Sequence, residues 1–217
     1  MPIFETNIPS TGPALALNRT HMLALLDEAR ALEQRTRDKS ASTKPLFDKR
    51  GQLLPRERVA LLLDPGAPFI EMSALAGFLF DRPEADKSIP GGGCISGIGF
   101  VSGVRCLIMA SDSGVEAGSI RPMGQDKIIR AQTIALENKL PFVHLVESAG
   151  ANLPNYKVEG FVRGGAIFRN LARLSAAGLP VVTVVHGSST AGGAYMPGLS
   201  DYVIMVRGRA RDRKSVV

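Results

Sequence analysis

From about residue 91 onward, the hydrophobic positions of the chain follow two alternating patterns. Continuous apolar and β-branched runs predict buried strands, whereas apolar residues that recur every three or four positions predict amphipathic helices. Strands are expected at 94–101, 104–110, 141–146 and 181–186, and helices at 123–140 and 161–177. A further helix is expected to start at Gly192-Gly193, and one more strand to follow it. The complete β-β-α-β-α-β-α-β order predicts an α/β fold in which right-handed crossovers join parallel strands.

The beginning of the chain has a mainly helical pattern. Residues 1–17 are interrupted by Pro and Gly and predict an extended arm, after which a helix is expected to begin at Asn18 or Thr20. This helix is expected to end in a polar loop at 35–40.

A second helix is expected to begin at Pro55, which suits the first helical position, and to stop at Asp64-Pro65-Gly66. Residues 69–72 predict a short strand. We therefore divide the chain into an arm with its helix at 1–50, a domain at 51–210 and a basic tail at 211–217.

The net charge of +6 does not indicate a nucleic-acid partner. Most of the charge comes from arginines and a lysine in the last residues of the chain, and a basic tail is usually a solvated end. No aromatic residues are interleaved with these cations to stack on bases. No apolar run is long enough to cross a membrane, and residues 1–20 lack the pattern of a signal peptide.

The two cysteines, Cys94 and Cys106, have neither CxxC spacing nor nearby histidines, so no metal site is expected. A hairpin turn at Ser102-Gly103 places Cys106 opposite about residue 99 and not opposite Cys94. Both are predicted to be reduced core thiols, which favours a cytoplasmic location.

Two of the predicted strands end in similar small-residue turns. The strand at 141–146 runs into Ser148-Ala149-Gly150-Ala151, and the strand at 181–186 runs into Thr190-Ala191-Gly192-Gly193-Ala194. In α/β sheets, ligands bind outside the carboxyl ends of the strands. Gly150 or Ala151 and Gly193 or Ala194 could each direct one N–H group at a single oxygen and so form an oxyanion hole. Either turn alone is more often only a tight connection, but the pair favours a site.

Other residues are weaker candidates. Glu147 and Asp112 could be general bases, although such residues more often cap loops. His144 has the pattern of a core histidine, and His186 lies next to the proposed hole. The cations with a possible role in binding phosphate are Arg121, Lys127 and Arg130.

Several motifs together resemble the carboxyltransferase β subunit of biotin-dependent acyl-CoA carboxylases. They include Leu53-Leu54-Pro55-Arg56-Glu57-Arg58, Ser148-Ala149-Gly150-Ala151-Asn152 and Thr190-Ala191-Gly192-Gly193-Ala194-Tyr195. The resemblance extends from about residue 18 to about residue 209 and is strongest to the methylcrotonyl-CoA and geranyl-CoA carboxylase branch. At Ser148-Ala149-Gly150 the family usually has Ser-Gly-Gly, so one position carries an additional methyl group.

The resemblance implies a crotonase-type ββα superhelix, in which 51–210 is an N-terminal domain that binds acyl-CoA. It implies transfer of a carboxyl group from carboxybiotin, where the biotin is attached to a partner α subunit with biotin carboxylase and biotin carrier functions. A homo-oligomer of β subunits is expected for the full-length protein. The alternatives are a propionyl-CoA or acetyl-CoA carboxyltransferase, a crotonase-type hydratase or isomerase, and a CoA-binding fragment without turnover.

On this resemblance, the site is formed by the two turns and a few flanking residues. The catalytic positions are Ala149, Gly150, Gly192 and Gly193, and the substrate-binding positions are Ser148, Ala151, Asn152, Ala194, Tyr195, Arg121 and Lys127. The family subunit has two such domains, and its second domain holds biotin. Because this chain has one domain and an atypical end at 211–217, we expect a truncated chain that is inactive alone.

Overall fold

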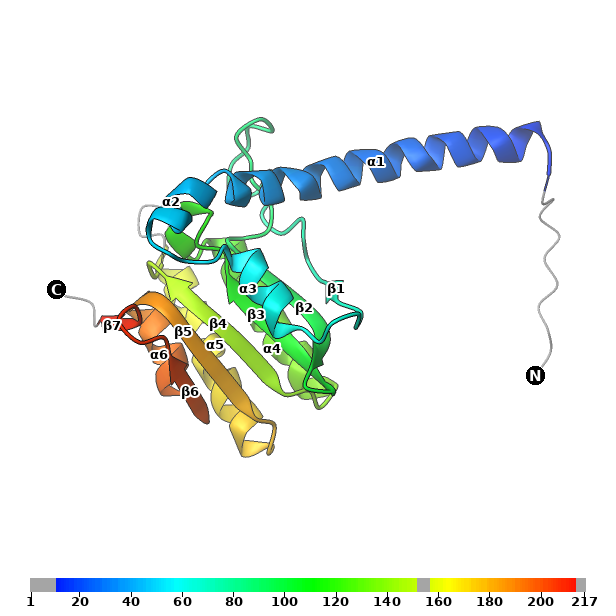
Figure 1. The fold of residues 1–217 in the computed structure, drawn as a ribbon. Coiled ribbons are helices and arrows are strands. Elements are labelled where there is room, and N and C mark those ends of the chain that lie inside the picture. The colour runs from blue at the N-terminus through cyan, green and yellow to red at the C-terminus, as the bar shows by residue number, and fades with distance from the viewer. Residues whose placement is uncertain (1–10, 152–156, 214–217) are drawn as a thin grey trace, which may run out of the picture.

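The computed structural model describes residues 11–151 and 157–213. One seven-stranded sheet forms its centre, with the strands in the order β1-β2-β3-β4-β5-β6 and with β7 paired to β5 (Figure 1). The strands are β1 (Ile70–Glu71), β2 (Cys94–Val101), β3 (Val104–Ser111), β4 (Phe142–Ser148), β5 (Val181–Thr190), β6 (Tyr202–Met205) and β7 (Arg211–Arg213). β1, β2 and β3 pair antiparallel, and the strands from β3 onward pair parallel. The predicted α/β order is therefore confirmed.

Helices cover both faces of this sheet (Figure 1). The helical segments are α1 (Pro13–Ala41), α2 (Lys44–Lys49), α3 (Pro55–Leu62), the 3₁₀ turn η1 (Glu116–Gly118), α4 (Pro122–Glu137), α5 (Val158–Ala176) and α6 (Gly192–Gly198). On one face, α4 and α5 pack against the sheet through a core that includes Leu107, Phe142 and Leu171. On the other face, Val59 of α3 packs against Ile95 and its neighbours. Burial of these apolar surfaces is the main stabilising contribution to the fold.

The N-terminal helix is longer than the sequence predicts. The polar segment 35–40, expected to be a loop, continues α1 to Ala41, and the helix already begins at Pro13. Two polar side chains attach this end of α1 to the domain: Ser40 Oγ donates a 2.6 Å hydrogen bond to Asp112 Oδ1, and Thr36 Oγ1 donates to the Pro90 carbonyl at 2.9 Å. Hydrophobic patterning does not detect this helix end because its buried contacts are polar. The remainder of α1 projects from the body of the domain (Figure 1).

Strand β5 is also longer than predicted, and this difference positions the candidate site. The expected strand ended at His186, but β5 continues to Thr190. After a shift of register, Ser189 pairs with Ser148 of β4, and residues 188–190 pair with β7. The segment 211–213, expected to be part of a basic tail, therefore forms the short strand β7.

The hairpin register predicted from the turn at Ser102-Gly103 is confirmed, since Cys106 lies opposite Gly99 and Cys94 opposite Ser111. Both cysteines are free and buried. Burial raises the pKa of both thiols.

His144 gives the folded state a defined dependence on acid. The side chain is 2% exposed, and burial lowers its pKa from 6.5 to about 4. Acid therefore favours the unfolded chain, which takes up a proton at the higher pKa. The stability linked to this group is complete above the unfolded pKa of 6.5 and is lost as the pH falls toward 4. We expect this group to remove about 2 kcal/mol of stability between pH 7 and pH 5.

The measurement is urea unfolding of the wild type and of His144→Phe at both pH values. The variant should lose about 2 kcal/mol less than the wild type over this interval, whatever its stability at pH 7. Equal losses in the two proteins would contradict the assignment of this pH dependence to His144.

Candidate functional site

The two small-residue turns lie side by side at the carboxyl ends of neighbouring strands. Ser148, the last residue of β4, pairs with Ser189 near the end of β5. A Cβ atom built on Gly193 would lie 3.3 Å from Ser148 Cβ, and one built on Gly150 would lie 3.2 Å from the Thr190 carbonyl oxygen. The two turns are thus in direct contact, and there is little room for a larger side chain at either glycine.

Within the first turn, internal hydrogen bonds use some of the N–H groups. Ala149 N donates to the Ala117 carbonyl at 3.2 Å, and Gly150 N donates to Ser148 Oγ at 3.1 Å. Ser148 Oγ in turn donates to the Gly118 carbonyl at 2.9 Å. Gly150 has a φ of 89°, which glycine adopts without strain. Among the described residues, the N–H of Ala151 has no partner.

The second turn leads into α6 and leaves the first N–H groups of this helix available. Ala194 N donates to the Ala191 carbonyl at 2.9 Å, and Tyr195 N donates to the same carbonyl at 3.3 Å. The N–H groups of Gly192 and Gly193 have no partner within the part of the chain that the structure describes. Ser189 Oγ donates to the Gly193 carbonyl at 2.6 Å and fixes the orientation of this peptide unit.

These contacts refine the predicted donors. Of the four alternatives considered, Gly150 and Ala194 already donate within the chain, whereas Ala151 and Gly193 do not. Unpaired backbone N–H groups at a fixed position can stabilise an oxygen on which negative charge develops. Ala151 in the first turn and Gly193 in the second are therefore the remaining candidate donors, and the oxyanion hole predicted from the sequence stays a prediction.

Aromatic side chains border the second turn. Tyr195 is 66% exposed, and its ring lies 5.6 Å from that of Phe168, centroid to centroid. Phe168 Cζ is 3.6 Å from the Cβ position of Gly192. The sequence did not single out Phe168, because its position in an amphipathic helix is typical of an ordinary core residue. The predicted substrate-binding residue Asn152 lies outside the described residues.

Arg121 and Lys127, which the sequence predicts as substrate-binding residues, are buried and paired within the domain. Arg121 is 5% exposed; its guanidinium pairs with Glu116 at 2.9 Å and donates to the Ile89 carbonyl. Lys127 is 4% exposed, and its Nζ donates to the carbonyls of Gly91 and Cys94 at 3.2 and 2.7 Å. Arg121 therefore connects the N-terminal flank of α4 to the loop before β2, and Lys127 connects α4 to this loop and to the first residue of β2. Helical spacing alone does not show which polar residues satisfy buried carbonyls, so the sequence did not reveal these contacts.

We expect Lys127→Met to destabilise the fold by about 2 to 3 kcal/mol, because two carbonyls lose a charged donor. Arg130→Met on the same helix is the matched control, since the Arg130 side chain is 64% exposed and lies 3.9 Å from Glu137. The control should change stability by less than about 0.5 kcal/mol. Urea unfolding measures both variants, and CoA affinity should be the same in each. A loss of CoA affinity in Lys127→Met without loss of stability would contradict this expectation and support the phosphate-binding role.

The two acidic candidates do not form an available general base. Glu147 accepts hydrogen bonds from Arg58 Nη1 at 2.6 Å and from Ser113 Oγ at 2.8 Å. Asp112 is buried and accepts a hydrogen bond from Ser40 of α1.

The two candidate histidines are buried to different extents. Burial, together with the charge of Arg58, lowers the pKa of His186 to about 4, so this imidazole is neutral at pH 7. His144 is the core histidine that the sequence predicts.

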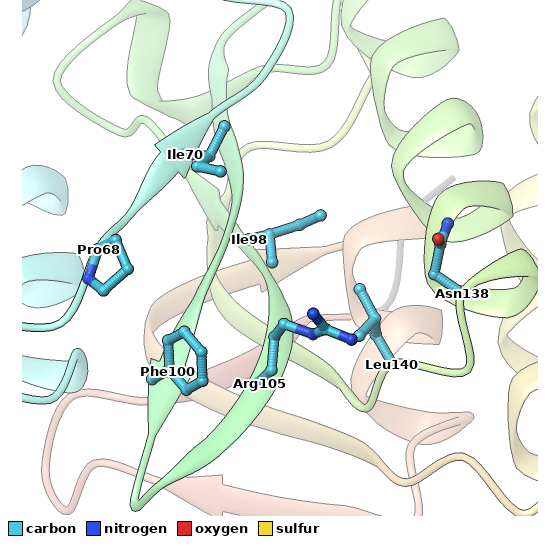
Figure 2. A pocket seen from close by; sticks show the side chains of 7 residues that line it. All are labelled: Pro68, Ile70, Ile98, Phe100, Arg105, Asn138 and Leu140. Carbon is cyan, nitrogen blue, oxygen red and sulfur yellow. The ribbon is translucent and has the colours of Figure 1, made fainter. Parts of the chain in front are cut away.

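A separate hollow of about 310 Å³ lies at the other end of the sheet (Figure 2). Its lining comes from β1 and the loop before it, the β2–β3 hairpin and the residues that follow α4: Pro68, Ile70, Ile98, Phe100, Arg105, Asn138 and Leu140. Leu140 precedes β4, so the hollow lies near the amino ends of the parallel strands and does not include either turn.

Among the described residues, no group of three potential metal ligands occurs, and none of the described helices is long and apolar enough to span a membrane.

Comparison with known proteins identifies the family. The model of the carboxyl transferase domain matches residues 48–211. The chain belongs to this family. It is 49% identical over 162 residues to the probable biotin-dependent acyl-coenzyme A carboxylase beta2 subunit of Mycobacterium tuberculosis, a match covering 75% of this chain and 29% of the relative.

Two further relatives specify the similarity. The chain is 50% identical over 164 residues to the biotin-dependent 3-methylcrotonyl-coenzyme A carboxylase beta1 subunit of M. tuberculosis, covering 73% of this chain and 30% of the relative. It is 55% identical to the crystal structure of the P. aeruginosa geranyl-CoA carboxylase beta subunit, with a TM-score of 0.90 over 98% of this chain and 40% of that chain. The carboxyl transferase domain therefore has the crotonase-like fold predicted from the sequence, and it spans less than one third of the two curated relatives.

Proposed function

We propose that this carboxyl transferase domain is the acyl-CoA-binding half of a biotin-dependent carboxyltransferase. In the proposed reaction, a carboxyl group passes from carboxybiotin to a branched, unsaturated acyl-CoA of the methylcrotonyl or geranyl type. The observation that carries this proposal is the contact between the two turns, at which Ala151, Gly192 and Gly193 have N–H groups without partners among the described residues.

The chemistry follows from the charge on the thioester oxygen. When the acyl group becomes a carbanion equivalent, this oxygen gains negative charge, and nearby N–H donors stabilise that charge. Removal of one such donor typically reduces the rate by about 10²- to 10³-fold. Biotin would accept the proton after losing its carboxyl group, so this chain needs no general base of its own. This role is consistent with the engagement of Glu147 by Arg58 and Ser113.

The choice of acyl group is supported by two named relatives. The proteins with 50% and 55% identity are a 3-methylcrotonyl-CoA carboxylase and a geranyl-CoA carboxylase subunit. The same proposal includes a partner α subunit that carries the biotin. It also includes a homo-oligomer of β subunits for the full-length protein and a cytoplasmic location. The two free, buried cysteines are consistent with a reducing compartment.

Isothermal titration calorimetry tests the proposal with methylcrotonyl-CoA, geranyl-CoA, free CoA and biotin as separate ligands. The chain should bind both thioesters more tightly than free CoA and should not bind biotin. If no CoA compound binds, the site assignment fails. If free CoA binds as tightly as the thioesters, the chain is better described as a CoA-binding fragment that has no functional oxyanion hole.

A further inference from the structure

The pairing of β4 and β5 is irregular just before the two turns. Val146 pairs with Val185 and Ser148 pairs with Ser189, so one residue of β4, Glu147, faces three residues of β5, namely 186–188. Such bulges bend a strand and redirect the residues that follow it. The contacts that fix this irregularity therefore also fix the position of each turn relative to the other.

The side chain of Glu147 occupies the space beside this bulge. A Cβ atom on Gly187 would overlap the Glu147 carboxylate, so glycine allows this close approach. Gln52 Nε2 donates to Glu147 Oε1 at 3.3 Å, and Arg58 and Ser113 donate to Oε2. The Arg58 side chain is 5% exposed and that of Glu147 is 14% exposed, so water screens this ion pair only weakly.

Arg58 is itself fixed from the α3 side of the sheet. Its Nε donates to the Leu53 carbonyl at 2.9 Å, and its guanidinium carbon lies 5.7 Å from the centre of the Phe47 ring. On the backbone side, Gly118 approaches the Glu147 carbonyl so closely that a Cβ atom would overlap it. Glu147 is thus held between α3 and the 3₁₀ turn η1, whose Gly118 carbonyl also accepts the hydrogen bond from Ser148 Oγ.

We propose that Arg58 and Glu147 are positioning residues that hold the β4–β5 bulge and thereby set the relative placement of the N–H groups of Ala151 and Gly193. Neither residue needs to touch the substrate for this role. When the carboxylate is made neutral, the buried guanidinium loses its counter-ion and the bulge loses the contact that fills it. The inference deepens the proposed function, on which it rests for the identity of the ligand.

Two variants test the ion pair, and the same helix offers a matched control. Glu147→Gln keeps the size of the side chain and removes its charge, whereas Arg58→Lys keeps the charge and removes the planar fork. The control is Glu71→Gln, because Arg56 of α3 pairs with Glu71 at 2.8 and 2.9 Å and this pair connects α3 to β1. Glu71→Gln therefore measures the effect of losing a comparable ion pair that lies away from the two turns.

Calorimetry should show that Glu147→Gln and Arg58→Lys each weaken binding of methylcrotonyl-CoA by about three- to tenfold, the effect of one hydrogen bond. Binding of free CoA, which has no thioester carbonyl, should change by less than about twofold. Glu71→Gln should change neither affinity. A general loss of stability would weaken the binding of methylcrotonyl-CoA and of free CoA by the same factor. If the ratio of these two affinities is unchanged in both test variants, the inference is overturned.

A second measurement uses the chain without ligand and is independent of the proposed function. The amide resonances of Ala151, Gly192 and Gly193 should move in Glu147→Gln and in Arg58→Lys and should stay in place in Glu71→Gln. Unchanged resonances in both test variants would overturn the inference. Failure of the wild type to bind any acyl-CoA, with the resonances moving as expected, would reject the proposed function and leave the positioning role supported.

Discussion

Replacement of Gly193 by valine is expected to weaken binding of methylcrotonyl-CoA by at least about tenfold. The Cβ position of Gly193 is 3.3 Å from Ser148 Cβ and 3.6 Å from Ser189 Oγ, so the branched side chain must displace one of the two turns. This displacement would change the placement of the Gly193 N–H group relative to that of Ala151, on which the proposed oxyanion hole depends. Isothermal titration calorimetry measures the loss.

The matched control is Gly198→Ala at the other end of α6. A Cβ atom at Gly198 meets no atom within 4 Å, so this variant should bind the thioester as the wild type does. Normal thioester affinity in Gly193→Val would show that the second turn is only a connection between β5 and α6. Equal losses in both variants would attribute the effect to α6 as a whole and not to the turn.

Gly92→Ala is expected to destabilise the fold by roughly 2 to 5 kcal/mol, the second large effect. Gly92 has a φ of 63°, and a Cβ atom there would lie 2.6 Å from Gly124 Cα in α4. The variant therefore adds a steric collision between two backbones to the cost of the left-handed conformation. Urea unfolding of the chain gives the loss directly.

Gly103 separates these two contributions. It has a φ of 77°, but a Cβ atom there meets no atom within 4 Å. Gly103→Ala should therefore cost only about 1 to 2 kcal/mol, which is the conformational part alone. If Gly92→Ala costs no more than Gly103→Ala, the close approach of the loop before β2 to α4 does not occur in solution.

The strand and helix order was predictable because burial and periodicity determine it. The run of apolar and β-branched residues at Val181–Val185 favours a buried strand, and the hairpin turn at Ser102-Gly103 fixes the register of β2 and β3. The two turns that follow β4 and β5 were predictable for the same reason. Parallel strands that are neighbours in a sheet bring their carboxyl ends together.

Long-range polar contacts were not predictable from the sequence. Lys127 has the spacing of an exposed helical cation, but its Nζ donates to the carbonyl of Gly91 in the loop before β2 and to that of Cys94 at the start of β2. The bond between Ser40 and Asp112 likewise extends α1 through a segment that has the composition of a loop. Each contact joins residues more than thirty positions apart, and periodicity contains no information about such pairs.

The donors within the site also required the structure. The sequence left Gly150 or Ala151, and Gly193 or Ala194, as open alternatives. Hydrogen bonds from Gly150 N to Ser148 Oγ and from Ala194 N to the Ala191 carbonyl favour Ala151 and Gly193 as the donors. These bonds depend on the φ of 89° at Gly150 and of 51° at Ala191, which residue types alone do not determine.

The central claim is that backbone N–H groups of the two turns polarise the carbonyl of a bound thioester. Infrared spectroscopy of methylcrotonyl-CoA labelled with ¹³C at the thioester carbonyl measures this polarisation directly. When the labelled thioester binds to the wild type, its carbonyl stretch should move to lower frequency. The labelled thioester that still binds to Gly193→Val should show no such shift. A carbonyl frequency that is the same in bound and free thioester would contradict the claim.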